Sequence, residues 1–296
     1  MSAPVVARTR TELADLLAKR RESGERVAFV PTMGALHDGH ASLMREARAR
    51  VTEDGRTGPL VVSIFVNPMQ FAPGEDLDRY PRTFDADLEI CAREDVDLVF
   101  APSVAEVYPG GDPMVTVDPG PLATVLEGRS RPTHFHGVLT VVGKLFGLVR
   151  PDVAVFGQKD YQQLALIRQM SSDLCLGVEV VGAPTIREAD GLALSSRNQY
   201  LSAQDRVEAL ALSRALCAAQ RADQHGPEAA LAAARTELDS AKAVDLDYLQ
   251  ILAPDLSQLP ADVPPGTEAR ILIAARVGST RLIDNMPLHL GREGTP

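Results

Sequence analysis

Two histidines separated by two residues, His37 and His40, stand where a predicted strand passes into a predicted helix. The apolar run 26–30 is long enough for one buried strand, and residues 41–50 have the pattern of a helix with Asp38 as its cap. A helix N-terminus presents unpaired N–H groups and the positive end of the helix dipole, so it binds anions. Imidazoles placed there donate hydrogen bonds to phosphate oxygens. The stretch predicts a phosphate-binding corner; a capped helix with surface histidines is the alternative.

A second corner of this kind follows the apolar run 153–156, where a glycine and three polar residues (157–160) precede a predicted helix over 161–174. Lys159 is placed there to act as a point charge on a phosphate. Further along, the serine–serine–arginine cluster 195–197 groups two hydroxyls beside a guanidinium, which suits a triphosphate. The alternative for Lys159 is a solvated lysine near the start of a helix. The alternative for the two serines is that they only close a turn.

Two amide side chains, Asn67 and Gln70, follow the nearly continuous apolar run 60–66. Such a run predicts a strand buried on both faces of a parallel sheet, and ligands bind outside the carboxyl ends of those strands. Both amides are therefore candidate substrate contacts, unless Asn67 and the proline after it only end the strand. The stretch 126–138 gathers cations and histidines in a predicted loop, either a plain basic loop or an anion-binding one.

Two carboxylates, Asp85 and Asp87, fall in the first turn of a predicted helix over 84–93, with Thr83 as its cap. Acidic residues at that end complement the helix dipole. A metal-binding role is the alternative.

Composition limits the classes of function. The chain has 296 residues and a net charge of −10, so no general affinity for nucleic acid is expected. No run approaches the roughly 20 apolar residues of a membrane span, and no signal-peptide core is present. Three distant cysteines, Cys91, Cys175 and Cys217, have no metal-ligand spacing. They predict reduced, mostly buried thiols in a cytoplasmic protein.

Strands and helices alternate through residues 1–185, which predicts a Rossmann-like, doubly wound parallel sheet of the α/β class. A Gly/Pro-rich connection over 109–121 is expected to hold one short strand at 114–117. The polar stretch 74–82 is expected to form a mobile flap.

The character changes near Ile186, which predicts a second, smaller α+β domain over 186–296. Residues 194–197 lie at the junction, where they are expected to close over a ligand. The predicted elements of this domain are helices over 202–221 and 227–241, strands over 246–252 and 269–275, and separate short extended pieces at 281–283 and 288–290.

The motif His37-Asp38-Gly39-His40 is the His-x-Gly-His signature of the nucleotidylyltransferase superfamily, to which the class I aminoacyl-tRNA synthetases also belong. Taken with further blocks in the expected order, the chain resembles the pantothenate synthetase (pantoate–β-alanine ligase) family over nearly its whole length. The blocks are 31–40, 63–71, 80–83, 131–138, 157–163, 194–198 and 282–285.

The resemblance implies that pantoate attacks the α-phosphate of ATP to give pantoyl adenylate and pyrophosphate. The amine of β-alanine then displaces AMP, which completes pantothenate. It also implies Mg²⁺ bound with the ATP and a homodimer. No nucleic-acid or membrane partner is expected, because of the net charge and the lack of a long apolar run. A sister nucleotidylyltransferase, a synthetase that charges a carrier and a nucleotide-binding regulator are the alternatives.

The resemblance also assigns roles to particular residues. Those implied to act in catalysis are His40 as proton donor, His37 and Lys159 on the phosphates, and Arg197. Those implied to line the ATP site are Met33, Gly34, His37, Gly39, His40, Gly157, Lys159, Asp160, Ile186 beside the adenine, Leu194, Ser195, Ser196 and Arg197. Those implied to hold pantoate or β-alanine are Gln70, Gln163, Asn67, Arg131 and His134, and Asp87 matches a Mg²⁺-associated position.

The clearest departure from the family pattern is at residue 158, and Ala86 also stands where some members have an acidic residue. Where the family usually has Gly-Glu-Lys-Asp, this chain has Gln158 in place of the glutamate. Glutamine keeps the capacity for hydrogen bonds but removes a charge next to Lys159. Activity is expected to survive this change.

Overall fold

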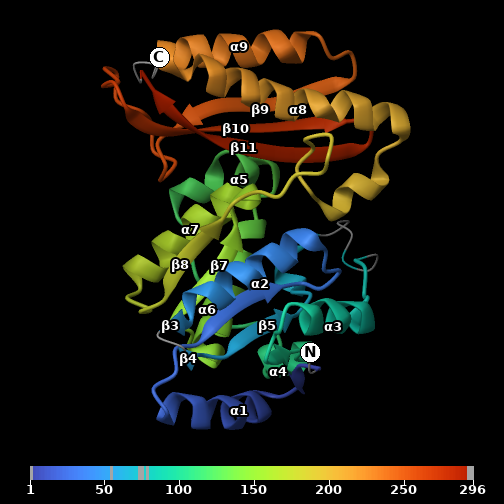
Figure 1. The fold of residues 1–296 in the computed structure, drawn as a ribbon, viewed down its shortest axis with the longest axis vertical. Coiled ribbons are helices and arrows are strands. Elements are labelled where there is room, and N and C mark those ends of the chain that lie inside the picture. The colour runs from blue at the N-terminus through green and yellow to red at the C-terminus, as the bar shows by residue number, and fades with distance from the viewer. Residues whose placement is uncertain (1–2, 54–55, 73–76, 78–79, 292–296) are drawn as a thin grey trace. The chain divides into compact units, whose positions relative to one another are not determined.

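Alternating apolar runs and helical segments build a six-stranded sheet in this computed structural model, which describes residues 3–53, 56–72, 77 and 80–291 (Figure 1). The strand order is β1-β6-β5-β2-β7-β8, and every neighbouring pair is parallel. This confirms the predicted doubly wound α/β fold. The strands are β1 (Val5–Ala7), β2 (Ala28–Thr32), β5 (Leu60–Ile64), β6 (Leu98–Phe100), β7 (Val153–Gly157) and β8 (Glu179–Ala183), beside a small hairpin of β3 (Thr52–Glu53) and β4 (Arg56–Thr57).

The helices of this part lie between the strands along the chain. They are α1 (Arg10–Glu22), α2 (Asp38–Arg50), the 3₁₀ helix η1 (Pro68–Gln70), α3 (Phe84–Arg93), α4 (Val104–Val107), η2 (Pro121–Thr124), α5 (Glu127–Ser130), α6 (His134–Val149) and α7 (Tyr161–Asp173).

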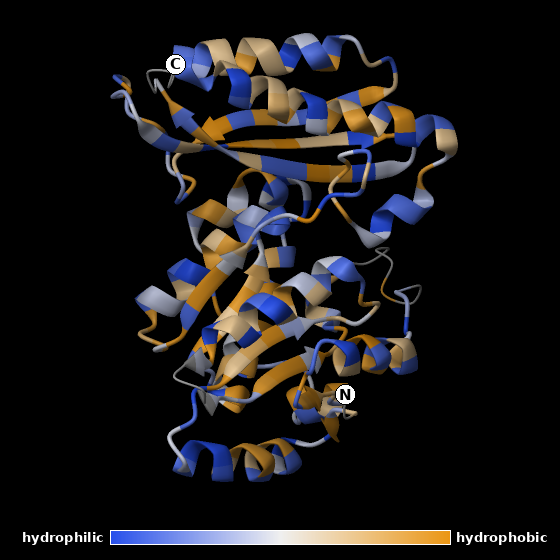
Figure 2. Cartoon of the chain, in the orientation of Figure 1, coloured by the Kyte–Doolittle hydropathy of each residue, from blue (hydrophilic) through white to orange (hydrophobic). Residues whose placement is uncertain are grey.

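The central strand β2 is buried on both faces because its side chains alternate between two helices. Ala28 and Val30 pack in one apolar cluster with Met44 of α2. Between them Phe29 points the other way and meets Phe146 of α6 edge-on, with 6.5 Å between ring centroids. The orange strands of this sheet in Figure 2 reflect that double burial. Because helices occupy both faces of the sheet, the loops lie at the edge formed by the carboxyl ends of the strands.

The chain divides into two compact units. Unit 1 is residues 1–157 with 162–184, and unit 2 is residues 158–161 with 185–296. The elements of unit 2 are η3 (Gln158–Asp160), η4 (Ser196–Tyr200), α8 (Ala203–Ala222), η5 (Asp223–His225), α9 (Pro227–Asp239), β9 (Val244–Leu252), β10 (Thr267–Val277) and β11 (Thr280–Leu290).

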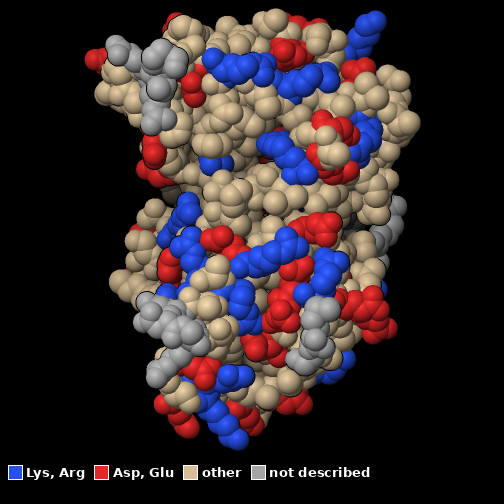
Figure 3. Space-filling view, viewed as in Figure 1, with Lys and Arg blue, Asp and Glu red and all other residues tan. Residues whose placement is uncertain are grey.

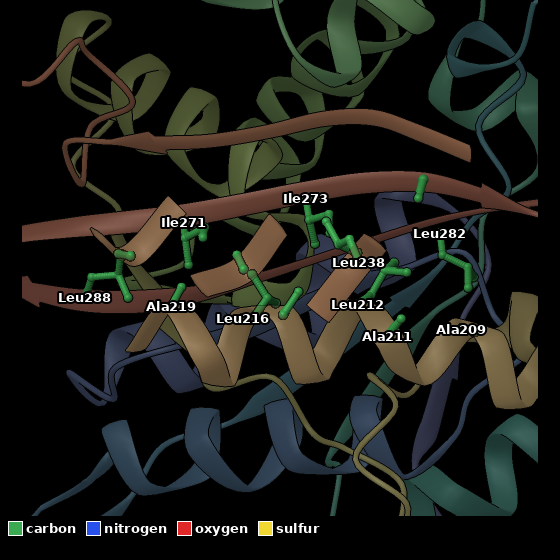
Figure 4. Close-up of a cluster of buried hydrophobic side chains, with 14 of the residues drawn as sticks. Ala209, Ala211, Leu212, Leu216, Ala219, Leu238, Ile271, Ile273, Leu282 and Leu288 are labelled. Atoms are coloured by element: carbon green, nitrogen blue, oxygen red, sulfur yellow. The ribbon is translucent and has the colours of Figure 1, made fainter. Parts of the chain in front are cut away.

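The core of unit 2 lies between its helices and an antiparallel sheet of order β11-β10-β9. Ile271 and Ile273 of β10 pack against Leu212 and Leu216 of α8, and all four are essentially inaccessible to solvent (Figure 4). Leu238 of α9 joins the same cluster. The predicted α+β character is thereby confirmed.

Three local predictions are wrong. The two extended pieces expected at 281–283 and 288–290 are one continuous strand, β11. Pro287 is tolerated inside it because β11 is an edge strand, where a missing N–H need not break the ladder. Residues 114–117 form no strand in the described structure, and Met114 and Val115 are exposed. The predicted loop at 126–138 is largely helical, with α6 beginning at His134.

Three further points concern the cysteines, the predicted flap and membrane spans. All three cysteines are free; Cys91 is buried and Cys217 is half-buried, but Cys175 is exposed, so it differs from the expected buried thiols. Most of the predicted flap at 74–82 lies outside the described residues. None of the helices in the described parts of the chain is long and apolar enough to cross a membrane. Figure 3 shows acidic and basic side chains interspersed on the visible face of each unit.

Candidate active site

The histidine corner begins with an imidazole as the helix cap. His37, not Asp38, is the N-cap of α2, so the predicted cap is off by one residue. The Nδ1 atom of His37 accepts the N–H of Gly39 at 3.1 Å. The Nδ1 atom of His40 accepts the N–H of His37 at 3.3 Å, which closes a reciprocal capping box. The ring centroids lie 4.2 Å apart.

These two bonds fix which nitrogen of each ring carries hydrogen. A ring nitrogen that accepts a backbone N–H has no proton of its own, so in both His37 and His40 the hydrogen is on Nε2. Each imidazole therefore presents an Nε2–H donor beside the first turn of α2. Two such donors next to a helix N-terminus suit an anion with several oxygens.

The loop before the histidines is held by a carboxylate 52 residues away in sequence. Asp87 is 2% exposed, and its oxygens accept the N–H groups of Ala35 at 3.1 Å and Leu36 at 2.8 Å. The hydroxyl of Thr83 also donates to it at 3.1 Å, so Thr83 occupies the N-cap position of α3 without capping that helix. At Gly34 a Cβ would lie 2.9 Å from a carboxylate oxygen of Asp87, and φ is +83°, so this close approach requires glycine.

The amides predicted at the end of β5 form one buried group. Gln70 and Asn67 are 9% and 1% exposed, and the Asn67 amide donates to Gln70 Oε1 at 3.3 Å. Gln70 in turn donates from Nε2 to the sulfur of Met33 at 2.8 Å. The structure thus brings three predicted site residues, from two strand ends, into direct contact.

Asn67 has no hydrogen-bonding capacity left over for a substrate. Its amide nitrogen also donates to the carbonyl of Gly137 at 3.1 Å, and its oxygen accepts from the N–H of Met69 and the hydroxyl of Tyr108. Burial raises the pKa of Tyr108 to about 12, so this phenol stays a neutral donor. We therefore read Asn67 as a residue that orients Gln70.

Arg131, the residue that follows α5, and His134, the first residue of α6, reach the same place. Both contact the main-chain carbonyl of Gln70, Arg131 through Nη2 at 3.3 Å and His134 through Nδ1 at 3.1 Å. A carbonyl only accepts, so the His134 ring carries its hydrogen on Nδ1. Gly137 allows this approach, because a Cβ there would lie 2.3 Å from the carbonyl oxygen of Met69.

Gln162 was not anticipated from the sequence. It is 3% exposed, and its amide accepts the N–H of Glu127 at 2.9 Å and donates to the carbonyls of Leu122 and Val125. Its neighbour Gln163 is half-buried, and its side chain makes no hydrogen bond within the described residues. Two adjacent glutamines thus differ, because the hydrogen bonds of the first are taken up by the backbone from η2 to the start of α5.

In unit 2, the segment 158–161 carries the predicted lysine. The side chain of Lys159 is 18% exposed, with its Nζ 3.8 Å from a carboxylate oxygen of Asp160. The carbonyls of Gln158 and Lys159 each accept a hydrogen bond of 2.9 Å from Asn285. Gln158 accepts a hydrogen bond of 3.2 Å from Arg270 through its amide oxygen.

The other predicted part of unit 2 is the stretch from Ile186 to Arg197. Ser195 is the N-cap of η4 and accepts the N–H of Arg197 at 3.3 Å, while Ser196 and Arg197 are exposed. Leu194 donates from its N–H to the carbonyl of Ile186 at 2.9 Å. The capping alternative is therefore correct for the hydroxyl of Ser195.

Arg187 anchors this stretch to β11. Its guanidinium pairs with both oxygens of Asp284 at 2.7 and 3.0 Å. Burial alone would lower the pKa of Arg187, but the hydrogen bonds to Asp284 and the negative charge beside the guanidinium together outweigh it and raise that pKa above its ordinary value.

Comparison with known proteins decides between the superfamily members. A family model described as pantoate-beta-alanine ligase matches residues 5–287. The chain belongs to this family. A curated family member, the pantothenate synthetase of a Nocardioides species, is 71% identical over 293 residues, which are 99% of this chain and 88% of that protein.

Two solved structures of the pantoate-beta-alanine ligase family share the fold. The crystal structure of pantothenate synthetase from Thermus thermophilus matches with a TM-score of 0.85 and 46% identity, covering 95% of this chain and 98% of that one. The pantoate-beta-alanine ligase from Francisella tularensis, complexed with beta-gamma ATP and beta-alanine, matches with a TM-score of 0.75 and 35% identity. The match covers 96% of this chain and 97% of that one.

Proposed function

We propose that this enzyme condenses pantoate with β-alanine at the expense of ATP, which releases AMP and pyrophosphate. The observation that carries the proposal is the family match over residues 5–287, together with the paired imidazoles at the start of α2. The alternative superfamily activities do not account for that match.

The reaction has two steps. An oxygen of the pantoate carboxylate bonds to the α-phosphorus of ATP, the bond to the bridging oxygen breaks, and pyrophosphate leaves. The amine nitrogen of β-alanine then attacks the acyl carbon, an amide forms, the acyl–oxygen bond breaks, and AMP departs. The amine proton passes to water, since no side chain is assigned as its base.

Phosphoryl transfer of this kind needs positioning and charge stabilisation more than covalent chemistry. We assign His37 and His40 to phosphate oxygens, to which each ring donates a hydrogen bond through Nε2–H. The proton-donor role that the family resemblance gives His40 is then the donation of this hydrogen bond, because the ring is neutral with Nδ1 unprotonated. Lys159 and Arg197 supply positive charge to the same triphosphate. The other residues proposed to line the ATP site are Met33, Gly34, Gly39, Gly157, Asp160, Ile186, Leu194, Ser195 and Ser196.

We assign residues 1–185 to ATP and pantoate binding and 186–296 to a lid function. Gln70 and Gln163 hold pantoate, and Gln70 later holds β-alanine. Asn67, Arg131 and His134 support Gln70, as their contacts with it suggest. We place the protein in the cytoplasm, which its three free cysteines support.

An assay of AMP release, with each of the three substrates omitted in turn, tests the function. AMP should form only when pantoate, ATP and β-alanine are all present. AMP release without β-alanine would favour a sister nucleotidylyltransferase, and no turnover would favour a nucleotide-binding regulator.

Gln163 and Gln162 provide a matched pair for the pantoate site. Changing Gln163 to leucine should raise the KM for pantoate about tenfold or more, because it removes an uncommitted amide proposed to bind the substrate, and leave the melting temperature nearly unchanged. Changing Gln162 to leucine should instead lower the melting temperature, because three backbone groups lose their partner. Steady-state kinetics and thermal unfolding of both variants check this; the reverse pattern would refute the assignment.

We propose that Mg²⁺ enters bound to the phosphates of ATP, which is how this ion commonly binds with nucleotides. Both oxygens of Asp87 are already engaged by hydrogen-bond donors, which favours the loop-holding role over a direct metal ligand. Among the described residues, no three His, Cys, Asp or Glu side chains group as metal ligands.

The variant Asp87→Asn separates these two roles. It should destabilise the protein by about 1–3 kcal/mol, because one buried N–H loses its acceptor. The Mg²⁺ concentration that gives half-maximal activity at fixed ATP should stay within about twofold of the wild-type value. A large increase in that concentration, with unfolding unchanged, would make Asp87 a metal ligand.

We also propose that the enzyme is a homodimer, as its family resemblance implies. Met114 is fully exposed and Val115 is 87% exposed, which is unusual for adjacent large apolar residues and suits a surface covered by a second copy. Val115→Glu should convert a dimer to a monomer in light scattering after size-exclusion chromatography. Val207→Glu, at an exposed apolar position of α8, is the control. A wild-type monomer, or a Val115→Glu dimer, would contradict this interface.

A further inference from the structure

Asp284 and Asn285 are neighbours in β11 and belong to the block 282–285 of the family resemblance. None of the roles assigned so far involves that block. Each is only 4% exposed, although both are polar. Successive side chains of a strand point to opposite faces of the sheet, so these two residues reach different surroundings. Their partners are the two segments of unit 2 that carry the proposed ATP ligands.

Asn285 holds the segment that carries Lys159. Its amide nitrogen donates to the carbonyls of Gln158 and Lys159, which flank the Cα atom of Lys159, at 2.9 Å each. Its amide oxygen accepts from Arg270 at 2.5 Å. The Arg270 guanidinium also donates to Gln158 Oε1 and lies 3.9 Å from the ring centroid of Tyr161. One amide therefore fixes the backbone from which the lysine extends.

Asp284 holds the other segment. Its carboxylate pairs with Arg187, whose Nη1 also donates to the carbonyl of Gly191 at 3.1 Å. Arg187 directly follows Ile186, whose carbonyl accepts the N–H of Leu194. The chain from Leu194 continues into the serines and the arginine proposed to bind the triphosphate.

We propose that Asp284 and Asn285 are positioning residues for adenylate formation, Asn285 for the Lys159 segment and Asp284 for the stretch that leads to Arg197. The proposal rests on the proposed function. The lysine ammonium lies at the end of a flexible four-carbon stem, so its reach is set by where the backbone is fixed. A displacement of about 1 Å at a reacting group is enough to lower a rate by about 10²-fold.

The variant Asn285→Asp tests the proposal with little change of shape. It keeps an oxygen for Arg270 but replaces the donor to two carbonyls with a second oxygen, which those carbonyls repel. The added charge faces the Arg270 guanidinium, which favours retention of the fold. We expect kcat/KM for ATP in pantoate-dependent ATP–pyrophosphate exchange to fall at least about tenfold. The KM for β-alanine should stay within about twofold.

Leu288→Ala is the control for general damage to unit 2. Leu288 also lies on β11 and is fully buried, and it packs in the apolar cluster that includes α8. It should lower the melting temperature while kcat/KM for ATP, measured well below that temperature, stays within about twofold. A merely structural role for Asn285 would make the two variants behave alike.

Asp284→Asn is a second variant. It allows the proposal to be refuted even if Asn285→Asp folds poorly. It keeps the shape and one acceptor for Arg187 and should also lower kcat/KM for ATP severalfold or more. Wild-type exchange rates in the variants that fold would overturn the positioning roles while the proposed function stands. Absence of pantoate-dependent exchange in the wild-type enzyme would overturn the proposed function and this inference together.

Discussion

Replacing Lys159 with alanine should lower pantoate-dependent ATP–pyrophosphate exchange by about 10²-fold or more, the usual loss when one transition-state donor is removed. Negative charge moves onto the departing pyrophosphate as the bond to the α-phosphorus breaks. An ammonium at that point stabilises the transition state more than bound ATP, so the loss should fall chiefly on kcat.

The surroundings of Lys159 make this test specific. Its backbone is held by Asn285 rather than by its own side chain, so truncation of the side chain leaves the segment in place. The variant should therefore unfold at nearly the wild-type temperature. Lys242→Ala removes an exposed lysine elsewhere in unit 2 and should leave exchange unchanged. Exchange within about twofold of wild type in Lys159→Ala would refute the assigned role.

The second large effect is expected at His40. The variant His40→Ala should also lose about 10²-fold or more in adenylate formation, because the Nε2–H donor beside the α2 N-terminus is gone. It should lose stability as well, by about 1 kcal/mol, because the N–H of His37 loses its acceptor.

Two substitutions of His40 separate catalysis from capping. In His40→Asn, the oxygen of the introduced amide can take the position of Nδ1 and keep the cap, but no donor replaces Nε2–H. His40→Asn should therefore unfold like the wild type and be as inactive as His40→Ala in the exchange assay. Exchange near the wild-type rate in His40→Asn would show that the imidazole serves the helix alone.

The parallel sheet was predictable because each strand carries its own signal. Runs such as 60–64 are apolar almost throughout, and a strand buried on both faces needs that pattern regardless of its neighbours. Glycines and prolines between runs marked the loops. The same local signals put His37 and His40 at a strand-to-helix corner, and the family motifs supplied their proposed chemistry.

Errors in the predicted elements arose where pairing or packing overrides local sequence. β11 is continuous through Asp284, Asn285 and Pro287 because β10 pairs with it along its full length. Residues 114–117 are apolar enough for a strand, but no neighbouring strand in the described structure pairs with them. Pairing partners are a property of the folded chain.

The sequence by itself determined the fold class, the family and the corner at which the imidazoles stand, since these depend on residue types and short spacings. Only the tertiary structure decided which polar residues use their hydrogen bonds to hold other residues in place. Asp87 reaches a loop 52 residues away, and Asn67 turns all of its hydrogen bonds toward the protein. Asn285 lies 126 residues from the lysine backbone it holds. Such contacts leave no local pattern, because they depend on which segments the packed sheets bring together.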